Sequence, residues 1–252
     1  MKKTKETLTA VGFKEKLGVV CRGPVSEYEP FEKKGKLGVR YKADNRIVLD
    51  AAFTYIEVFA IEYDVFFIVG NEGQFGLYYK DTEIIPVQYN EIVQISHTPK
   101  IFGAYVDQKH FDVYWRNGLL TKHCEEYLVD GFYVKVKHID NEEELFGFIG
   151  DYEAETIIRK GKYNIKLYKD YIIVDDGKPV VYNYKGCKIS EDVSGKYVQY
   201  GGYLVHITGT VIKFYNKNGR EIDLYETYDD VVMAQEYVLV KHGGHWRLLY
   251  SV

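Results

Sequence analysis

The chain has 252 residues, of which 46% are apolar and 28% charged, a composition that supports a buried core and argues against disorder. Its net charge of −4 argues against a general nucleic-acid binder, which would need a basic face. The three cysteines, Cys21, Cys124 and Cys187, lie far apart and are odd in number, so they indicate neither a disulfide framework nor a metal site.

The N-terminal stretch "MKKTKETLTAVGFKEK" begins with basic residues, but Glu6, Lys14 and Glu15 leave no apolar run of signal-peptide length. The most apolar stretch of the sequence, "VFFIVG" at 65–70, is far too short to cross a bilayer. We therefore expect a cytoplasmic protein that does not enter a membrane. Export without a leader sequence would leave no trace in this pattern.

From residue 36 onward the sequence is organised by a repeat. A short strand-like segment such as "QFGLYYK" at 74–80 returns at near-equal steps, and its apolar lead residue identifies each copy. Successive lead residues are 38, 36, 35, 34, 32 and 34 positions apart, a regularity typical of repeat proteins. We expect the lead residues to be buried at equivalent depth, and the aromatic ones to be large core side chains. The lead residues are Leu37, Phe75, Phe111, Phe146, Val180, Ile212 and Trp246.

Each unit continues with the same order of elements. A polar turn and a second strand follow the lead, then a tyrosine 14 to 18 residues after it, then a strongly apolar closing run. Apolar and polar residues alternate with period two, as in "YVLVK" at 237–241, which favours strands over helices. Strands of this length with tight turns need about 30–36 residues per unit, which matches the step. The repeat tyrosines are Tyr55, Tyr89, Tyr127, Tyr163, Tyr197 and Tyr228.

The pattern and its period resemble the WG-repeat (KWG-repeat) family, whose units read like "G-K-W-G-L-I-D-x-x-G-x-x-I-I-P-x-x-Y-D-x-I". The best copy is "GQFGLYYKDTEIIPVQYNEI" at 73–92, and the resemblance covers roughly residues 35–252. The signature Trp survives only at Trp246, and the following Gly only at Gly38, Gly76 and Gly147. The resemblance implies a β-repeat interaction module of bacterial proteins without a shared catalytic centre.

We predict an all-β fold of tandem repeats of about 35 residues, in a propeller-like closed array of seven four-stranded units; the alternative is an open β-meander solenoid. The sequence ends in a lone lead strand at 245–252, and segments 16–22 and 25–34 read as missing strands of that unit. Joining them would remove both exposed sheet edges. Residues 1–34 would then complete the last repeat unit and residues 35–252 would form the array, as one domain. Against closure, the step is shorter than the roughly 40–50 residues usual for propeller blades.

The joints between each closing run and the next lead residue vary most in length and chemistry. In repeat arrays, residues at one offset gather on one edge, and insertions collect on the binding face. Histidines and carboxylates concentrate in these joints, so we predict that they form a binding surface. The simpler interpretation is that turns are polar and tolerant of change. The candidate residues are His110, His138, Asp140, Glu142, Glu143, Glu144, Asp175, Asp176, His242 and His245.

No nucleophile elbow, phosphate-binding loop, dinucleotide fingerprint or paired metal motif occurs in the sequence. Neighbouring acids such as Glu125 and Glu126 would point to opposite faces of a strand, unlike the facing carboxylates of a glycosidase. The pair of His242 and His245 has no third ligand nearby, so we expect no metal site and no cofactor. We predict a non-catalytic scaffold, monomeric, that binds another protein and neither nucleic acid nor a membrane. The alternative is a carbohydrate or small-ligand binder that uses aromatic and acidic side chains.

Overall fold

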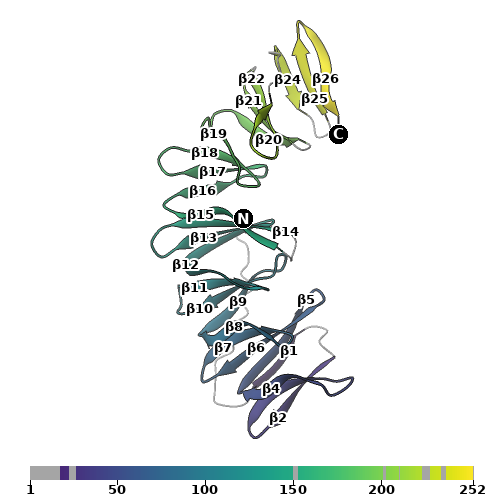
Figure 1. Cartoon of the computed structure of the whole chain (residues 1–252), viewed down its shortest axis with the longest axis vertical. Coiled ribbons are helices and arrows are strands. Elements are labelled where there is room, and N and C mark those ends of the chain that lie inside the picture. Colours follow the sequence, from purple (N-terminus) through teal and green to yellow (C-terminus); the bar gives the residue numbers. More distant parts are fainter. Residues whose placement is uncertain are drawn as a thin grey trace. The chain divides into compact units, whose positions relative to one another are not determined.

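The structure, a computed structural model, describes residues 18–22, 27–149, 153–200, 203–209, 211–222, 228–233 and 237–251. All regular elements in these ranges are β-strands, 26 in number, which confirms the all-β prediction. In the same ranges no helix is long and apolar enough to span a membrane. Figure 1 labels most of these strands by their number in the chain. The protein forms two compact units, the first of residues 1–141 and 148–154 and the second of residues 142–147 and 155–252.

The first unit contains sheets built from consecutive strands. One has the order β2 (Tyr28–Lys33), β3 (Lys36–Tyr41) and β4 (Ile47–Phe53). The next has the order β1 (Gly18–Arg22), β5 (Tyr55–Ile61), β6 (Asp64–Asn71), β7 (Gln74–Tyr79) and β8 (Thr82–Tyr89). A third runs through β9 (Glu91–Ser96), β10 (Ile101–Tyr105), β11 (Phe111–Trp115), β12 (Gly118–Asp130) and β13 (Tyr133–His138). Its order continues with β14 (Glu143–Ile149) and β15 (Glu153–Gly161), most of whose residues belong to the second unit.

The second unit contains shorter sheets. One comprises β16 (Asn164–Leu167), β17 (Tyr171–Asp175), β18 (Val180–Asn183) and β19 (Lys188–Ser190). Another comprises β20 (Lys196–Tyr200), β21 (Tyr203–Thr208), β22 (Val211–Tyr215) and β23 (Glu221–Ile222). The last has the order β24 (Asp230–Met233), β25 (Tyr237–His242) and β26 (His245–Ser251).

Most sheets take their strands from two successive sequence repeats. In the second sheet, β5 carries the repeat tyrosine Tyr55, β6 is the closing run, β7 is the lead strand and β8 is the second strand, all paired antiparallel. The closing and lead strands therefore form a hairpin. Its two turn residues, Glu72 and Gly73, have φ values of 52° and 80°, as in the type I′ turns that match the twist of paired strands. The predicted succession of strands within a repeat is confirmed.

The predicted division into seven four-stranded units is not reproduced sheet by sheet. Strand β12 is 13 residues long and serves both as the second strand and as the tyrosine strand of the same repeat, pairing with β11 and with β13. Strands of three successive repeats therefore form one seven-stranded sheet. Among the described residues the strands form six sheets, none of them closed on itself.

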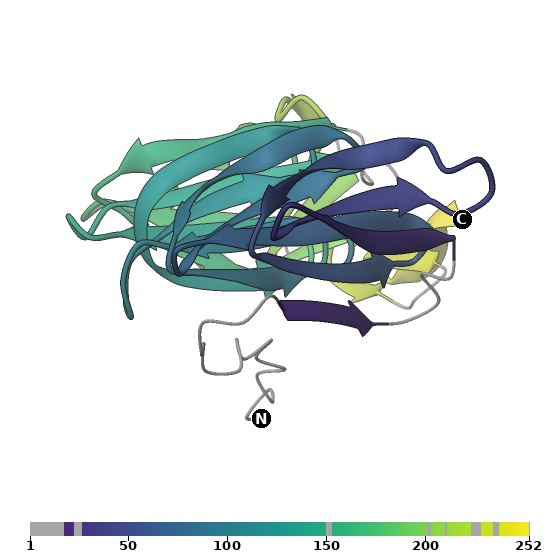
Figure 2. The same ribbon diagram turned by 90° about the horizontal axis from the view of Figure 1, so that it is seen from below.

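Strand β1 lies at an edge of the second sheet. Residues 16–22 are predicted to belong to the repeat unit that the N-terminal segment completes. In the structure β1 pairs in parallel with β5, from Gly18 opposite Tyr55 to Arg22 opposite Phe59 (Figure 2, the lower of the two purple arrows). The edge of β5 offers unpaired backbone groups that an apolar segment such as "GVVC" can cover. Residues 1–17 and 23–26 lie outside the described residues, and completion of the last repeat by residues 1–34 stays a prediction.

Most lead residues lie where the repeat predicts. The half-buried ones are Val180 and Ile212, so the burial depth is not equal throughout. In the first unit, two hydrophobic clusters contain the lead residues of β3 and β7 together with aliphatic and aromatic side chains of their neighbouring strands. The buried lead residues are Leu37, Phe75, Phe111 and Phe146.

The prediction of a buried lead residue is wrong for Trp246, whose side chain is 46% exposed. Its strand, β26, is the edge of a three-stranded sheet and pairs only with β25 among the described strands. Phe75 differs from Trp246, because its strand β7 pairs with β6 on one side and with β8 on the other. The indole instead lies near Lys241, whose Nζ is 5.9 Å from the ring centroid.

The glycine after the lead residue has a steric function. Gly76 lies between the pairs Phe75–Tyr89 and Leu77–Ile85, so it alone faces residues 86–88 of the bulged strand β8. A Cβ on Gly76 would lie 2.6 Å from the Ile85 carbonyl oxygen, closer than real Cβ atoms come to backbone. Only glycine therefore lets the second strand approach the lead strand this closely.

We expect Gly76→Ala to destabilise the fold by about 1–3 kcal/mol, because the added methyl group would force the backbone of β8 aside. The matched control is Gly73→Asn, in a turn where φ is 80° and an added Cβ would meet no atom within 4 Å. Asn tolerates this left-handed conformation, so the control should lose less than about 1 kcal/mol. Urea unfolding followed by circular dichroism measures both, and equal losses would contradict the bulge as the cause.

Candidate functional site

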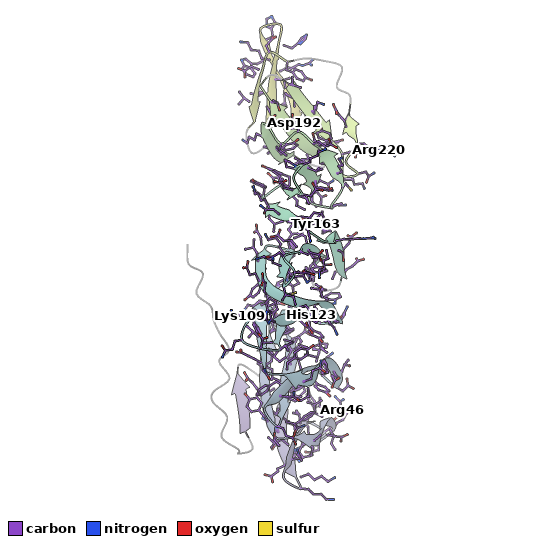
Figure 3. The ribbon with its side chains drawn as sticks, turned by 90° about the vertical axis from the view of Figure 1, so that its left-hand side faces the viewer. Arg46, Lys109, His123, Tyr163, Asp192 and Arg220 are labelled. Atoms are coloured by element: carbon purple, nitrogen blue, oxygen red, sulfur yellow. The ribbon has the colours of Figure 1, made fainter. Side chains whose placement is uncertain are left out.

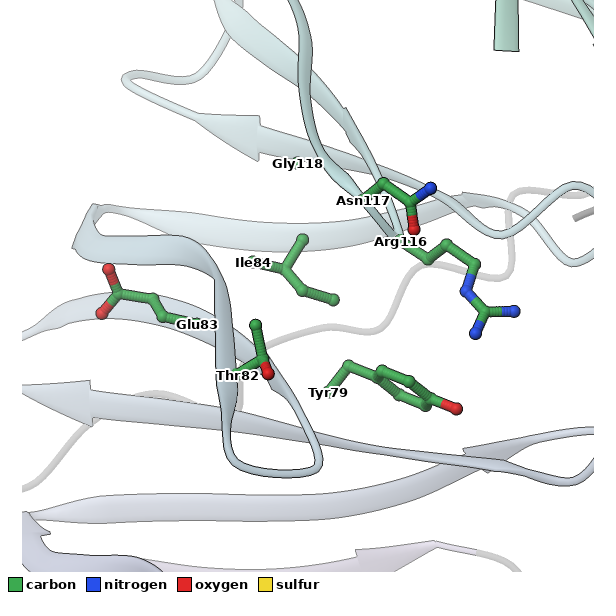
Figure 4. Close-up of a pocket in the computed structure, with 7 residues that line it drawn as sticks. All are labelled: Tyr79, Thr82, Glu83, Ile84, Arg116, Asn117 and Gly118. Carbon is green, nitrogen blue, oxygen red and sulfur yellow. The ribbon is translucent and has the colours of Figure 1, made fainter. Parts of the chain in front are cut away.

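A cavity of about 310 Å³ lies within the first unit, at the edge where the β7–β8 and β11–β12 hairpins turn (Figure 4). We call it the Arg116 pocket. It combines an aromatic ring, an aliphatic side chain and several hydrogen-bonding groups. Its lining residues are Tyr79, Thr82, Glu83, Ile84, Arg116, Asn117 and Gly118.

The β7–β8 hairpin determines which side chains face the pocket. Tyr79 is directly opposite Thr82, so both side chains lie on the same face of the hairpin. Tyr78 and Glu83 form the next pair, on the other face, where the Tyr78 hydroxyl donates a 2.8 Å hydrogen bond to the Glu83 carboxylate. In Figure 4 the Glu83 carboxylate accordingly points away from the other side chains. The pocket wall from this hairpin is therefore the ring of Tyr79, the hydroxyl of Thr82 and the apolar side chain of Ile84.

An ionic network beneath the pocket joins hairpins of successive repeats. The Tyr79 hydroxyl donates a 2.6 Å hydrogen bond to Asp64, the first residue of β6 after the β5–β6 turn. The other Asp64 oxygen lies 3.4 Å from Lys100 Nζ and 3.8 Å from an Arg116 nitrogen. Lys100, whose side chain is only 2% exposed, is also 3.2 Å from Glu62. Charged groups from three turns thereby hold one another in place.

The network sets the protonation of its central pair. Burial disfavours the carboxylate of Asp64, but the hydrogen bond from Tyr79 and the charges of Lys100 and Arg116 outweigh it and lower the pKa of Asp64. Burial and the hydrogen bond to Asp64 raise the pKa of Tyr79 above its ordinary value. At neutral pH the pair consists of a carboxylate acceptor and a neutral phenol donor, and neither group changes protonation there.

Arg116 lies over the edge of this network. Its guanidinium carbon is 5.1 Å from the centroid of the Tyr79 ring, within the range of a cation–π contact. Lys80 Nζ is also 5.1 Å from that centroid. Figure 4 shows the guanidinium above the ring, on the same side of the pocket as the phenol oxygen. The Tyr79 ring and the Asp64 carboxylate together orient the guanidinium group of Arg116.

The sequence-predicted residues near β11 and β14 are mostly engaged in local structure. His110 Nδ1 lies 2.6 Å from the Asp107 carboxylate. The backbone N–H groups of Lys109 and His110 donate hydrogen bonds to that carboxylate and lower the pKa of Asp107 to about 2, and the contact with the His110 ring contributes less. His138 is buried, with Nδ1 2.9 Å from the carbonyl oxygen of Lys122. Asp140 is exposed in the turn that follows it.

The predicted residues of the second unit are similarly placed in turns and ion pairs. Glu142 lies 3.4 Å from Lys160, and Glu143 accepts a hydrogen bond from the backbone of Ile165. Glu144 follows them in β14. Asp175 and Asp176 accept hydrogen bonds from the backbone N–H groups of Gly177 and Lys178, respectively. His242 and His245 are exposed and directly opposed across a glycine turn.

None of the ten predicted residues lines the Arg116 pocket, and sequence reasoning missed the residues that do. A signal was present: an aromatic residue followed by a basic one recurs where lead strands end, as in Tyr79-Lys80 and Trp115-Arg116. Tyr41 and Tyr184 lie in the same place and also have cations within 6.0 Å of their ring centroids. In the described part of the protein, His, Cys, Asp and Glu side chains form no group of three or more that could hold a metal ion.

Comparisons with known proteins identify no family. No protein-family model and no curated protein matches the sequence. Among solved structures, the WD40 propeller domain of Doa1 is 15% identical over 93% of this chain and 91% of that one, with a TM-score of 0.26. BamB from Moraxella catarrhalis is 12% identical over 89% of this chain and 81% of that one, with a TM-score of 0.27. Likenesses this weak do not establish a shared fold, and they carry no argument about function.

We expect Asp64→Asn to reduce stability at pH 7 and to flatten its pH dependence. The folded-state pKa of Asp64 is depressed, so its contribution is present above the ordinary value of 3.8 and is lost as pH falls through the lower folded value. Wild-type protein should therefore lose more stability between about pH 5 and pH 3 than the variant does. Urea unfolding across this range measures the difference. Asp50→Asn, which removes an exposed carboxylate of β4, is the control and should follow wild type.

Proposed function

We propose that the protein is a non-catalytic β-repeat scaffold that binds another protein through the turns between its strands. The observation that carries the proposal is the ionic network at the edge of the first unit. It ties together the turns at Glu62, Lys100 and Arg116, which come from successive repeats. A surface held rigid in this way needs little further ordering when a partner binds, which favours affinity.

An exposed aromatic side chain beside the network supports a protein partner. Tyr63 lies between Glu62 and Asp64 at the tip of the β5–β6 hairpin, and its side chain is fully exposed. The β12–β13 turn of the same unit presents Phe132, which is 54% exposed. Tyrosine on a rigid turn supplies a large apolar surface and a hydroxyl, and it is among the residues that contribute most to protein interfaces.

Binding rather than catalysis fits the protonation of the pocket. General acid–base chemistry works best when a group titrates near the working pH. The pKa of Asp64 is lowered and that of Tyr79 is raised, so both shifts move away from neutrality. The pair thus acts as a structural clamp.

A carbohydrate ligand is the second candidate, because Tyr79, Thr82 and Asn117 line the pocket together. Sugars stack on an open aromatic face. Lys80 and Arg116 both lie 5.1 Å from the centroid of the Tyr79 ring, which leaves little of it open for stacking. A protein partner therefore explains the arrangement better.

The same proposal includes the finer architecture: a cytoplasmic, degenerate WG-repeat protein whose seven lead strands belong to a closed, propeller-like array. The regular repeat step and the recurring hairpins of closing and lead strands support it. For a compact protein of this length, small-angle scattering should give a radius of gyration of about 18 Å. A clearly larger value would favour the open solenoid.

The binding proposal is tested with purified protein as bait in lysate of the native host. We expect a specific protein to be retained by wild type and reduced at least tenfold by Tyr63→Ala combined with Arg116→Met. A variant of the predicted joints, His242→Ser with His245→Ser, should retain it. Loss in the histidine variant alone would move the binding surface to the joints. The scaffold proposal would be wrong if wild type retained no protein beyond background, and binding to a glycan array would support the carbohydrate alternative.

A further inference from the structure

We propose that the Arg116 pocket binds a carboxylate of the partner, from an Asp or Glu side chain or from the partner's own C-terminus. This inference rests on the proposed function, because it names the group that a protein partner inserts. It assigns the guanidinium of Arg116 as the recognition group, with Thr82 and Asn117 as neutral donors.

The guanidinium is suited to this task by its geometry. It presents N–H donors in a planar fork that matches the two oxygens of a carboxylate. Its nitrogen is 3.8 Å from Asp64, longer than a hydrogen bond, whereas Tyr79 and Lys100 approach Asp64 at 2.6 and 3.4 Å. The contact between Asp64 and Arg116 is therefore a charge interaction and not a hydrogen bond. The Arg116 side chain is 22% exposed and lines the cavity, so an incoming carboxylate can reach it.

The rest of the pocket fits the group that carries the carboxylate. Ile84 is buried and lies with the Tyr79 ring along the pocket wall, where both can contact the aliphatic stem of an acidic side chain. The Thr82 hydroxyl and the Asn117 amide add neutral hydrogen-bond donors. One apolar wall beside one charged fork is the arrangement expected for a short acidic side chain.

The surrounding charges favour a single negative charge over a dianion. Besides Arg116, the edge carries the cations Lys80 and Lys100, and four acids lie on the same turns. These acids are Glu62, Asp64, Asp81 and Glu83. A monoanion gains direct contact with the guanidinium at short range. A phosphate, with nearly two charges at neutral pH, would meet stronger repulsion from these carboxylates.

The test uses short amidated peptides with a central Asp or Glu, matched peptides with Asn or Gln, and matched peptides with phosphoserine. A further set consists of the Asn and Gln peptides with a free C-terminal carboxylate in place of the terminal amide. Binding is measured by fluorescence polarisation to wild type, Arg116→Met, Arg116→Lys and the control Arg46→Met. Arg46 also follows a lead strand and lies over an aromatic ring, with its guanidinium carbon 6.0 Å from the centroid of Tyr41. Circular dichroism and thermal unfolding verify that each variant is folded.

We expect wild type and Arg46→Met to prefer carboxylate peptides at least tenfold over the amide set, whether the carboxylate is in a side chain or at the C-terminus. Arg116→Met should abolish this preference, and Arg116→Lys should retain part of it, since lysine keeps the charge but not the fork. The Nε–H resonance of Arg116 should shift on addition of carboxylate peptide. If Arg116→Met unfolds, the Arg116→Lys comparison and this resonance still decide the outcome.

Three outcomes would overturn the proposal: no acid preference in wild type, an equal preference in folded Arg116→Met, or stronger binding of phosphoserine peptides. They are distinguishable from failure of the scaffold proposal. If the native partner is still captured through Tyr63 while the carboxylate preference is missing, the scaffold proposal is supported and the proposal of a carboxylate site is wrong. If capture and preference are both missing, both proposals fall.

Discussion

The close approach of the second strand to the lead strand is the constraint on which the repeat depends. At Gly38 and Gly76 a Cβ would lie 2.6 Å from a backbone oxygen of the second strand, so the side chain must be absent. The resulting bulge bends β4 and β8 across the sheet and allows the lead residues Leu37 and Phe75 to be covered on that side. Beyond the bulge the pairing resumes, and at β7–β8 it ends in the Tyr79–Thr82 pair that walls the Arg116 pocket.

Asp112 occupies the position after the lead residue at which Gly38 and Gly76 stand in the preceding repeats. In β11–β12 the bulge is shorter, since Asp112 faces only Lys122 and His123. His123, which is labelled in Figure 3, has a φ of 60°. It donates its backbone N–H to one Asp112 oxygen at 3.0 Å. The Tyr89 hydroxyl donates to the other oxygen at 2.8 Å, so the buried carboxylate is held by the strands around it. Beyond this bulge β12 continues unbroken into the segment that carries Tyr127 and pairs with β13.

The charged edge follows from the same repeat. Because the strands of a sheet alternate in direction, the turns of β5–β6 and β7–β8 lie at one edge of their sheet, and those of β9–β10 and β11–β12 lie at one edge of the next. The joints β6–β7 and β10–β11 lie at the opposite edges. Asp64, Tyr79, Lys100 and Arg116 come from these turns and share one network. The predicted joints instead use their acids in local turns and ion pairs, as Asp107 does with His110. The ionic network and the exposed Tyr63 thus lie at an edge that the sequence did not predict to be a binding surface.

The sequence by itself determined the all-β class, the repeat step and the order of strands within a repeat. These depend on local alternation, on turn residues such as Glu72-Gly73 and on apolar lead residues such as Phe75, all of which are short-range properties. Only the tertiary structure decided that Trp246 is exposed, because burial depends on whether a further strand covers β26. It also decided that β1 pairs with β5 and that Arg116 meets Asp64, residues 52 positions apart in the sequence. Such contacts depend on which sheet edges meet in space, and the residue pattern of one strand carries no record of that.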